Sequence, residues 1–267
     1  MLEKGKDDFP RGYSSITEIN GKHKEMLLDF GILKMVQGDE HRCSLGRERA
    51  FLLMGGKVEY LWPGQAVTAE RHSLLDENPW VLQVPRNLEV TIRCLSPEAE
   101  LCVERVENET AFEPVFYRPD DIRSDVFGKG TMQETSTRTV RTVFDGLNAP
   151  WSKMVLGEVI NHPGKWSSYP PHDHAQPEIY HYRLFPSQGF GINILEEEAD
   201  VIRNGDTAVI TPHKVHSQAA APGYAMYYLW MIPHLENDPF IPTSRNFRKE
   251  HEWLLKEDAV IWPDGKK

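Results

Sequence analysis

The sequence predicts an all-β fold made of two β-barrels in tandem, with few short helices. Short apolar runs recur along the whole chain, most of them too short for helices, and Gly, Pro, Asn and Asp separate them. Several runs alternate apolar and polar residues, as at Leu88, Val90 and Ile92, which is the period of a half-buried strand. The runs fall into two sets with a polar stretch between them. Many short, evenly spaced strands are typical of sandwiches and barrels.

The first set of strands predicts an N-terminal domain over residues 1–110. Two adjacent glycines, Gly55 and Gly56, interrupt one of its runs and are interpreted as a hairpin turn. The histidines of this half stand far apart in the sequence, so we expect this domain to carry no metal. Its apolar runs are 26–36, 50–62, 80–84, 88–95 and 99–106.

The second set predicts a C-terminal domain over residues 137–267, which ends in a tail with one or two helical turns. Residues 111–136 between the two domains are polar and are expected to be a connector. No internal repeat is visible at the level of residues, so the duplication rests on the strand pattern alone. The apolar runs of this half are 137–144, 152–160, 178–185, 190–195, 206–212 and 225–233.

Composition and charge narrow the class of protein. The chain has 267 residues, of which 40% are hydrophobic, so it is long and apolar enough to bury a core. Its formal net charge of −10 disfavours a nucleic-acid partner, because binding phosphates requires Lys and Arg. No apolar stretch approaches the roughly 18 residues of a membrane span, and no signal peptide is visible. We therefore expect a cytoplasmic protein whose three cysteines form no disulfide framework, with Cys94 and Cys102 as core residues.

Residues 166–191 carry the motif with the clearest chemistry. His172 and His174 are two residues apart, so both rings face the same side of an extended segment. Glu178 follows after a short loop, and His216 closes the later stretch NGDTAVITPHKVH. This H-x-H-x(3)-E … P-x(3)-H arrangement is that of cupin barrels. Three imidazoles and one carboxylate predict one divalent metal ion, with zinc as the first expectation and manganese, iron or nickel as alternatives.

The residues that follow this motif alternate between the two faces of the expected strand. Tyr180 and Tyr182 share the face of the glutamate ligand and are candidates to line a pocket for a polyol. The alternative is that both are packed barrel aromatics. His181 is expected on the opposite face, away from the metal. His213 is the alternative ligand in the last turn, and its preferred interpretation is a solvated turn residue.

Two arginines open the first strand of the second half. Either Arg138 or Arg141 is a candidate to bind a substrate carboxylate, since a guanidinium matches a carboxylate with two parallel hydrogen bonds. The alternative for each is a solvated or ion-paired side chain.

Several motifs resemble those of 5-deoxy-glucuronate isomerase of inositol catabolism, a family related to 4-deoxy-L-threo-5-hexosulose-uronate ketol-isomerase of pectin breakdown. The resemblance is close over residues 137–235 and is one of layout over the N-terminal half. In place of a longer acidic insertion, only three residues separate His174 from Glu178, so the pocket rim is expected to differ. The matching motifs are WSSYPPHDH (166–174), the E-x-Y-x-Y strand, QGFG (188–191), the NGD turn, the P-x-x-x-H loop and PGYAMYYLW (222–230).

The resemblance implies a bicupin and a metal-dependent aldose–ketose isomerisation of 5-deoxy-glucuronate to 2-deoxy-5-keto-gluconate. The partner would be a small sugar acid, and a homo-oligomer is expected. Two alternatives stay open: another cupin metalloenzyme, such as a dioxygenase or epimerase, and a sugar-binding cupin without turnover. The implied metal ligands are His172, His174, Glu178 and His216. The candidates for proton transfer are Tyr182, a metal-bound hydroxide, or Glu178 if it loosens from the metal. The candidate substrate contacts are Tyr180, Arg138, Arg141 and Gln188.

Overall fold

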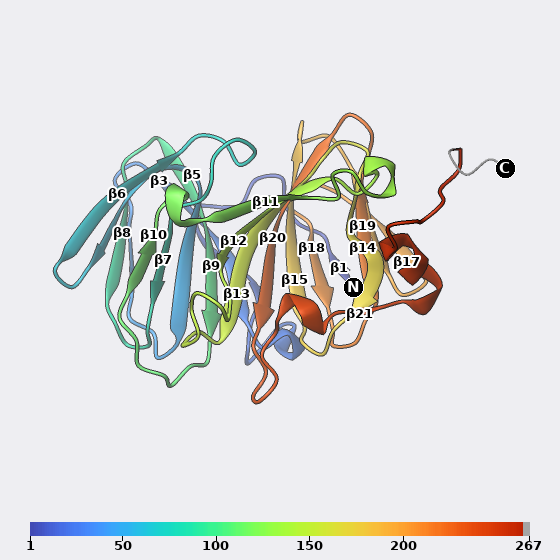
Figure 1. Ribbon diagram of the computed structural model, residues 1–267. Coiled ribbons are helices and arrows are strands. Elements are labelled where there is room, and N and C mark those ends of the chain that lie inside the picture. Colours follow the sequence, from blue (N-terminus) through green and yellow to red (C-terminus); the bar gives the residue numbers. More distant parts are fainter. Residues whose placement is uncertain (264–267) are drawn as a thin grey trace.

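The chain folds into two β-barrels that lie side by side (Figure 1). The computed structural model describes residues 1–263, which contain twenty-one strands, five short 3-10 helices and no α-helix. No helix within this range is long and apolar enough to cross a membrane. The predicted all-β fold with few short helices is confirmed. The 3-10 helices are η1 (Lys24–Met26), η2 (Pro119–Asp121), η3 (Met132–Glu134), η4 (Pro242–Ser244) and η5 (Lys249–Leu255).

The N-terminal barrel is a nine-stranded antiparallel sheet. Six strands follow the order β10-β7-β5-β9-β3-β2, and the remaining three are joined through β5 and β8. β8 shows the predicted alternation, because Val90, Ile92 and Cys94 are buried while the residues between them are partly or fully exposed. The strands are β2 (Gly12–Thr17), β3 (Asp29–Val36), β4 (Glu40–Cys43), β5 (Glu48–Trp62), β6 (Gln65–Arg71), β7 (Val81–Val84), β8 (Val90–Cys94), β9 (Glu98–Val106) and β10 (Val115–Tyr117).

Strand β5 runs unbroken through the two glycines for which the sequence predicts a hairpin, so that prediction is wrong. Its first half pairs with β7 and β9, and its second half pairs with β6 and β8. The register with β9 shifts between Leu53 and Gly55, where the strand bends. Gly56 has a φ of +90°, and a Cβ there would lie 2.3 Å from the carbonyl oxygen of Glu98. The glycines therefore allow one long strand to pass between two parts of the sheet.

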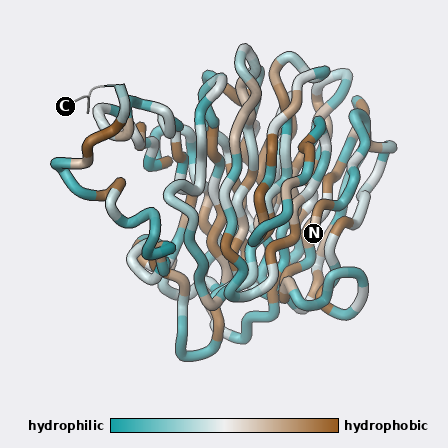
Figure 2. The backbone as a smooth tube through the Cα atoms, turned by 90° about the vertical axis from the view of Figure 1, so that its right-hand side faces the viewer, coloured by the Kyte–Doolittle hydropathy of each residue, from teal (hydrophilic) through white to brown (hydrophobic). Residues whose placement is uncertain are grey.

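The C-terminal barrel consists of two antiparallel sheets. Figure 2 looks onto this barrel and shows hydrophobic stretches along the strands and hydrophilic stretches in the loops at their ends. The seven-stranded sheet has the order β1 (Leu2–Glu3), β18 (Thr207–Ile210), β15 (Glu178–Phe185), β20 (Ala225–Pro233), β13 (Met154–Asn161), β12 (Arg138–Phe144) and β11 (Arg123–Phe127). The five-stranded sheet has the order β17 (Glu198–Ile202), β16 (Gly191–Leu195), β19 (His216–Ala220), β14 (Trp166–Asp173) and β21 (Asn246–Phe247).

A shared hydrophobic core joins the barrels. Cys102 of β9 and Ile179 of β15 belong to this shared core, whereas their neighbours Leu101 and Tyr180 belong to separate cores inside the two barrels. Strands at the interface are therefore buried on both faces, as in β13, where all eight residues are buried. The three cysteines are free, as predicted, and all are buried, as expected for Cys94 and Cys102.

The sheets cross the domain boundaries that the sequence predicts. β1 belongs to residues 1–110 but pairs with β18 of the C-terminal barrel. The predicted connector, residues 111–136, contains β10, which pairs with β7, and β11, which pairs with β12. All five side chains of β11 are exposed, so this edge strand has the polar composition of a loop. Thus β1 carries the start of the chain into the C-terminal barrel, whereas β10 extends the N-terminal barrel and β11 extends the C-terminal barrel.

Glu104 is a buried carboxyl group on strand β9. Its side chain is fully buried, and neither carboxylate oxygen has a hydrogen-bond partner within residues 1–263. Glu104 lies two residues after Cys102, so both side chains are on the face of β9 that packs against the C-terminal barrel. Burial raises the pKa of Glu104 well above its usual range, and the nearby Glu48 raises it further. The folded protein therefore holds this group in its protonated form.

We expect Glu104→Gln to remove a pH dependence of stability. In the unfolded chain the carboxyl loses its proton near its ordinary value of 4.5, whereas the folded chain keeps it. The unfolded state thus binds fewer protons as pH rises, and the parent loses up to about 1.4 kcal/mol per pH unit above that value. Urea unfolding of both proteins between about pH 5 and pH 8 measures the difference. Equal slopes for the two proteins would contradict a protonated Glu104.

Candidate metal centre

Three buried side chains from the two sheets meet at one end of the C-terminal barrel. Glu178 begins β15, His216 begins β19, and His174 follows directly after β14. His174 Nε2 lies 3.2 Å from Glu178 Oε2, and His216 Nε2 lies 3.2 Å from the same oxygen. One ligand atom from each residue falls within 4.8 Å of the other two, which is the spacing of donors around a single ion.

His172 lies beside this group. It pairs with His216 in the register of β14 and β19, and the two ring centroids are 4.9 Å apart. Its ring is 6.5 Å from that of His174, and it is not part of the three-residue group. The structure thus brings three of the four predicted ligands together and places the fourth next to them.

The imidazole tautomers suit metal binding. The Nδ1 atom of His172 lies 3.0 Å from the carbonyl oxygen of Pro170, and the Nδ1 atom of His216 lies 3.0 Å from that of Lys214. A carbonyl oxygen only accepts, so both Nδ1 atoms carry a proton, and Nε2 is the ring atom through which each histidine can bind a metal. His216 Nε2 is buried and lies 3.2 Å from Glu178 Oε2, but it makes no hydrogen bond of acceptable geometry within residues 1–263. Such a buried nitrogen without a hydrogen-bond partner fits a metal ligand.

The charges of the cluster agree with this set of donors. Burial lowers the pKa of His172 to about 3, so its ring is neutral at physiological pH. Burial alone would raise the pKa of Glu178, but contacts with His174 and His216 lower it overall and keep the carboxylate charged. Burial would lower the pKa of His216, but the same carboxylate raises it. A negative oxygen among imidazoles is a donor set for a divalent cation.

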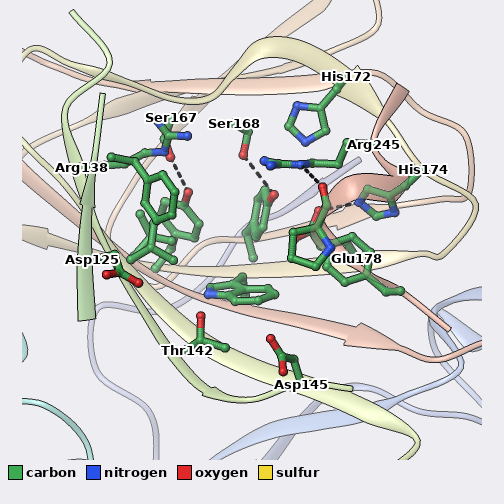
Figure 3. A pocket seen from close by; sticks show the side chains of 18 of the residues that line it. Asp125, Arg138, Thr142, Asp145, Ser167, Ser168, His172, His174, Glu178 and Arg245 are labelled. Atoms are coloured by element: carbon green, nitrogen blue, oxygen red, sulfur yellow. Dashed lines mark hydrogen bonds and ion pairs between the residues drawn. The ribbon is translucent and has the colours of Figure 1, made fainter. Parts of the chain in front are cut away.

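The cluster opens onto a cavity of about 260 Å³ (Figure 3). Hydroxyl groups line its wall in two pairs: Ser167 Oγ lies 2.6 Å from Tyr228 Oη, and Ser168 Oγ lies 3.1 Å from Tyr180 Oη. The guanidinium of Arg138 also faces the cavity. The wall therefore offers several hydroxyls and a cation to a polar ligand.

The remaining predicted site residues lie elsewhere. Tyr182 is fully buried in the barrel core and does not line the cavity; its hydroxyl donates to Gln218 Oε1 over 2.7 Å. Arg141 points into the interface between the barrels, where it donates to the carbonyl oxygens of the loop after β6. Gln188 is exposed in a turn away from the cavity. His181 faces the N-terminal half, as predicted, with its ring 5.4 Å from that of Phe30.

Sequence reasoning missed several residues of the cavity. Ser167 and Ser168 precede the H-x-H pair on β14, so the strand that carries the predicted ligands also supplies these hydroxyls. Phe240 and Arg245 come from the C-terminal tail, and no local pattern signals their place in the cavity. Their position depends on how the tail packs against β14.

A sequence profile of the KduI/IolB family matches residues 1–254. The chain belongs to the KduI/IolB family. The match covers both barrels, which confirms the resemblance found in the sequence and extends it through the N-terminal half.

Family relatives and solved structures agree with this assignment. The chain is 26% identical to a protein named 5-deoxy-glucuronate isomerase from Geobacillus thermodenitrificans, over 67% of this chain and 66% of that protein. It is 23% identical to one of the same name from Bacillus licheniformis, over 94% of this chain and 96% of that protein.

The fold is shared with solved proteins of low sequence identity. An IolB-like protein from Salmonella typhimurium superimposes with a TM-score of 0.83 at 19% identity, covering 96% of this chain and 99% of that one. An oxalate decarboxylase from Lactobacillus farciminis superimposes with a TM-score of 0.64 at 10% identity, covering 91% and 86%. These likenesses confirm the predicted pair of cupin barrels.

Proposed function

We propose that this KduI/IolB family member is a metal-dependent aldose–ketose isomerase of a deoxy-uronic acid. The reaction would convert 5-deoxy-glucuronate to 2-deoxy-5-keto-gluconate in myo-inositol catabolism. The observation that carries the proposal is the buried group His174, Glu178 and His216 at the end of a cavity lined by hydroxyls and guanidinium groups. The names of the relatives supply the reaction.

The proposed metal site consists of these three side chains with His172 as the fourth ligand. A bound divalent ion, zinc first and otherwise manganese, iron or nickel, would act as a Lewis acid on the carbonyl oxygen and the adjacent hydroxyl of the substrate. The neutral ring of His172 and the charged carboxylate of Glu178 provide lone pairs without a further change of protonation.

The proton transfer needs a base that faces the cavity. Isomerisation moves one proton between adjacent carbons and one between their oxygens, so the substrate keeps its oxidation level. Of the two candidates from the sequence, Glu178 lines the cavity and Tyr182 does not. The carboxylate of Glu178 is charged, so it can accept a proton if it loosens from the metal. We therefore propose Glu178 as the group that moves the proton, while Tyr180 holds a substrate hydroxyl.

The other predicted attributes stay proposals. A small sugar acid is the proposed partner, and Arg138 is the proposed contact for its carboxylate, because it alone of the two predicted arginines lines the cavity. A cytoplasmic location and a homo-oligomeric state stay predictions from the sequence.

We expect chelation to abolish turnover of 5-deoxy-glucuronate. Elemental analysis of the purified protein should find about one divalent metal per chain. Removing the metal with a chelator should stop the isomerase reaction, and adding the same metal back should restore it. A protein that binds the metal but does not convert 5-deoxy-glucuronate would rule out this substrate. Measuring oxygen uptake would then test for a dioxygenase. Undiminished turnover in the metal-free protein would overturn the proposed mechanism.

A further inference from the structure

The segment 234–256, here called the C-terminal strap, packs against the metal-binding end of the barrel (Figure 1). Its short strand β21 pairs with β14, placing Phe247 opposite His172. The backbone N–H of Arg248 donates to the carbonyl oxygen of Pro171 over 3.0 Å. The ring of Phe247 lies 5.5 Å from that of His172, and the ring of Phe240 lies 5.1 Å from that of His174. The strap thus forms part of the wall beside the proposed ligands.

The strap also carries a cation into the cavity. Arg245 lies beside His172 and Glu178 in Figure 3 and lines the same cavity as Arg138, which approaches from β12. Arg245 Nε donates to the carbonyl oxygen of Pro242 over 2.8 Å, and Arg138 Nη1 donates to a backbone carbonyl over 2.8 Å. Within residues 1–263, neither guanidinium lies within 4.0 Å of a carboxylate oxygen.

Two partly buried guanidinium groups without a carboxylate in ion-pair contact are unfavourable, and the charge of Glu178 offsets this only in part at Arg245. Burial lowers the pKa of Arg138, and the positive charge of Arg245 lowers it further. Burial also lowers the pKa of Arg245. Both groups nonetheless stay charged, because arginine does not lose its proton in proteins. Arg123 lines the same cavity but forms an ion pair with Asp145, whose carboxylate oxygen lies 2.5 Å away. It differs in this from Arg138 and Arg245.

We propose that Arg138 and Arg245 form an anion subsite that binds the carboxylate of a sugar acid, and that Arg245 is a specificity-determining residue delivered by the strap. A guanidinium binds a carboxylate through two parallel hydrogen bonds, and the anion would relieve the repulsion between the two cations. In a uronate the carboxylate and the aldehyde stand at opposite ends of the carbon chain. Only the identity of the anion rests on the proposed isomerase function; the charge preference follows from the two arginines.

Calorimetric titration of the chelator-treated protein with D-glucuronate tests the subsite without turnover. Losing a charge-assisted hydrogen bond should weaken binding of this acid to the Arg245→Gln protein on the order of 10- to 100-fold. Arg248→Gln is the matched control, because Arg248 lies three residues further along the strap, pairs with Glu196 and does not line the cavity. It should bind D-glucuronate as the parent does. The metal content of both variants should equal that of the parent.

Each outcome decides the proposal. Unchanged glucuronate affinity in Arg245→Gln would overturn it. An equal loss in both variants, or a loss of metal from Arg245→Gln, would also overturn it, because the strap would then act by packing alone. Weakened binding confined to Arg245→Gln supports the subsite even if the protein fails to isomerise 5-deoxy-glucuronate. Turnover that Arg245→Gln leaves undiminished would support the isomerase and reject the subsite.

Discussion

Replacing His174 by Ala should abolish both metal binding and turnover. His174 and His216 approach the same oxygen of Glu178 from two sides, so removing one ring opens the group. Even partners that only orient metal ligands contribute about 10- to 100-fold to metal affinity, so losing a ligand should cost more than roughly 100-fold. Lewis-acid stabilisation is worth several kcal/mol, so turnover should fall by roughly 1,000-fold or more. Elemental analysis and an isomerase assay on 5-deoxy-glucuronate measure the two effects.

His213→Ala is the control for this experiment. His213 lies three residues from His216, but its side chain is 69% exposed and its nearest charged partner is Asp173 at 3.9 Å. This variant should keep both metal and turnover. His172→Ala asks whether the neighbouring ring is the fourth ligand, and we expect it to weaken metal binding as well. Full activity in a metal-free His174→Ala protein would reject the proposed role of the site.

The alternation of side chains predicted the barrels but not every strand. β8 has one buried face and one more exposed face, so apolar and polar residues alternate along it and the sequence predicts the strand. β11 is an edge strand whose five side chains are all exposed, so its composition does not differ from that of a loop. β1 has two residues, and its place beside β18 comes from pairing with a strand more than 200 residues away. Local pattern carries no information on such contacts.

The same reasoning explains which site residues were predictable. His172 and His174 are two apart on an extended segment, and both line the cavity. Arg138 and Arg141 are three apart on β12, so only one can face the cavity, and period-2 geometry alone would have separated them. Periodicity gives the face of a strand but not the depth, which is why Tyr182 shares the face of Glu178 and still lies outside the cavity.

Replacing Glu158 by Gln should strongly destabilise the folded protein. Glu158 of β13 is fully buried at the interface between the barrels and binds the fully buried Arg71 of β6 through two hydrogen bonds of 2.6 and 2.9 Å. Arg141 and the hydroxyl of Tyr227 donate to the same carboxylate. Removing one partner of a buried ion pair costs about 3–5 kcal/mol, because the remaining charges stay buried without compensation. Urea unfolding of parent and variant measures this loss.

Glu40→Gln is the matched control for the buried network. Glu40 also accepts hydrogen bonds from two arginines, Arg93 and Arg42, but it lies on the surface, where water screens the charges. The midpoint of unfolding should therefore change little in this variant. Equal midpoint shifts for Glu40→Gln and Glu158→Gln would show that burial does not set the strength of the network.

The two arginines that bind Glu158 also donate hydrogen bonds to backbone carbonyl oxygens. In this respect the network differs from an isolated ion pair. Arg71 donates to the carbonyl oxygens of Leu53 and Glu77, and Arg141 donates to those of Leu74 and Leu75. Apolar replacement of a buried ion pair is often harmless, but here it would leave these carbonyl oxygens without donors. We therefore expect Arg71→Met combined with Glu158→Leu to be no more stable than Glu158→Gln. A double variant as stable as the parent would show that the charges alone, and not the backbone contacts, matter at this interface.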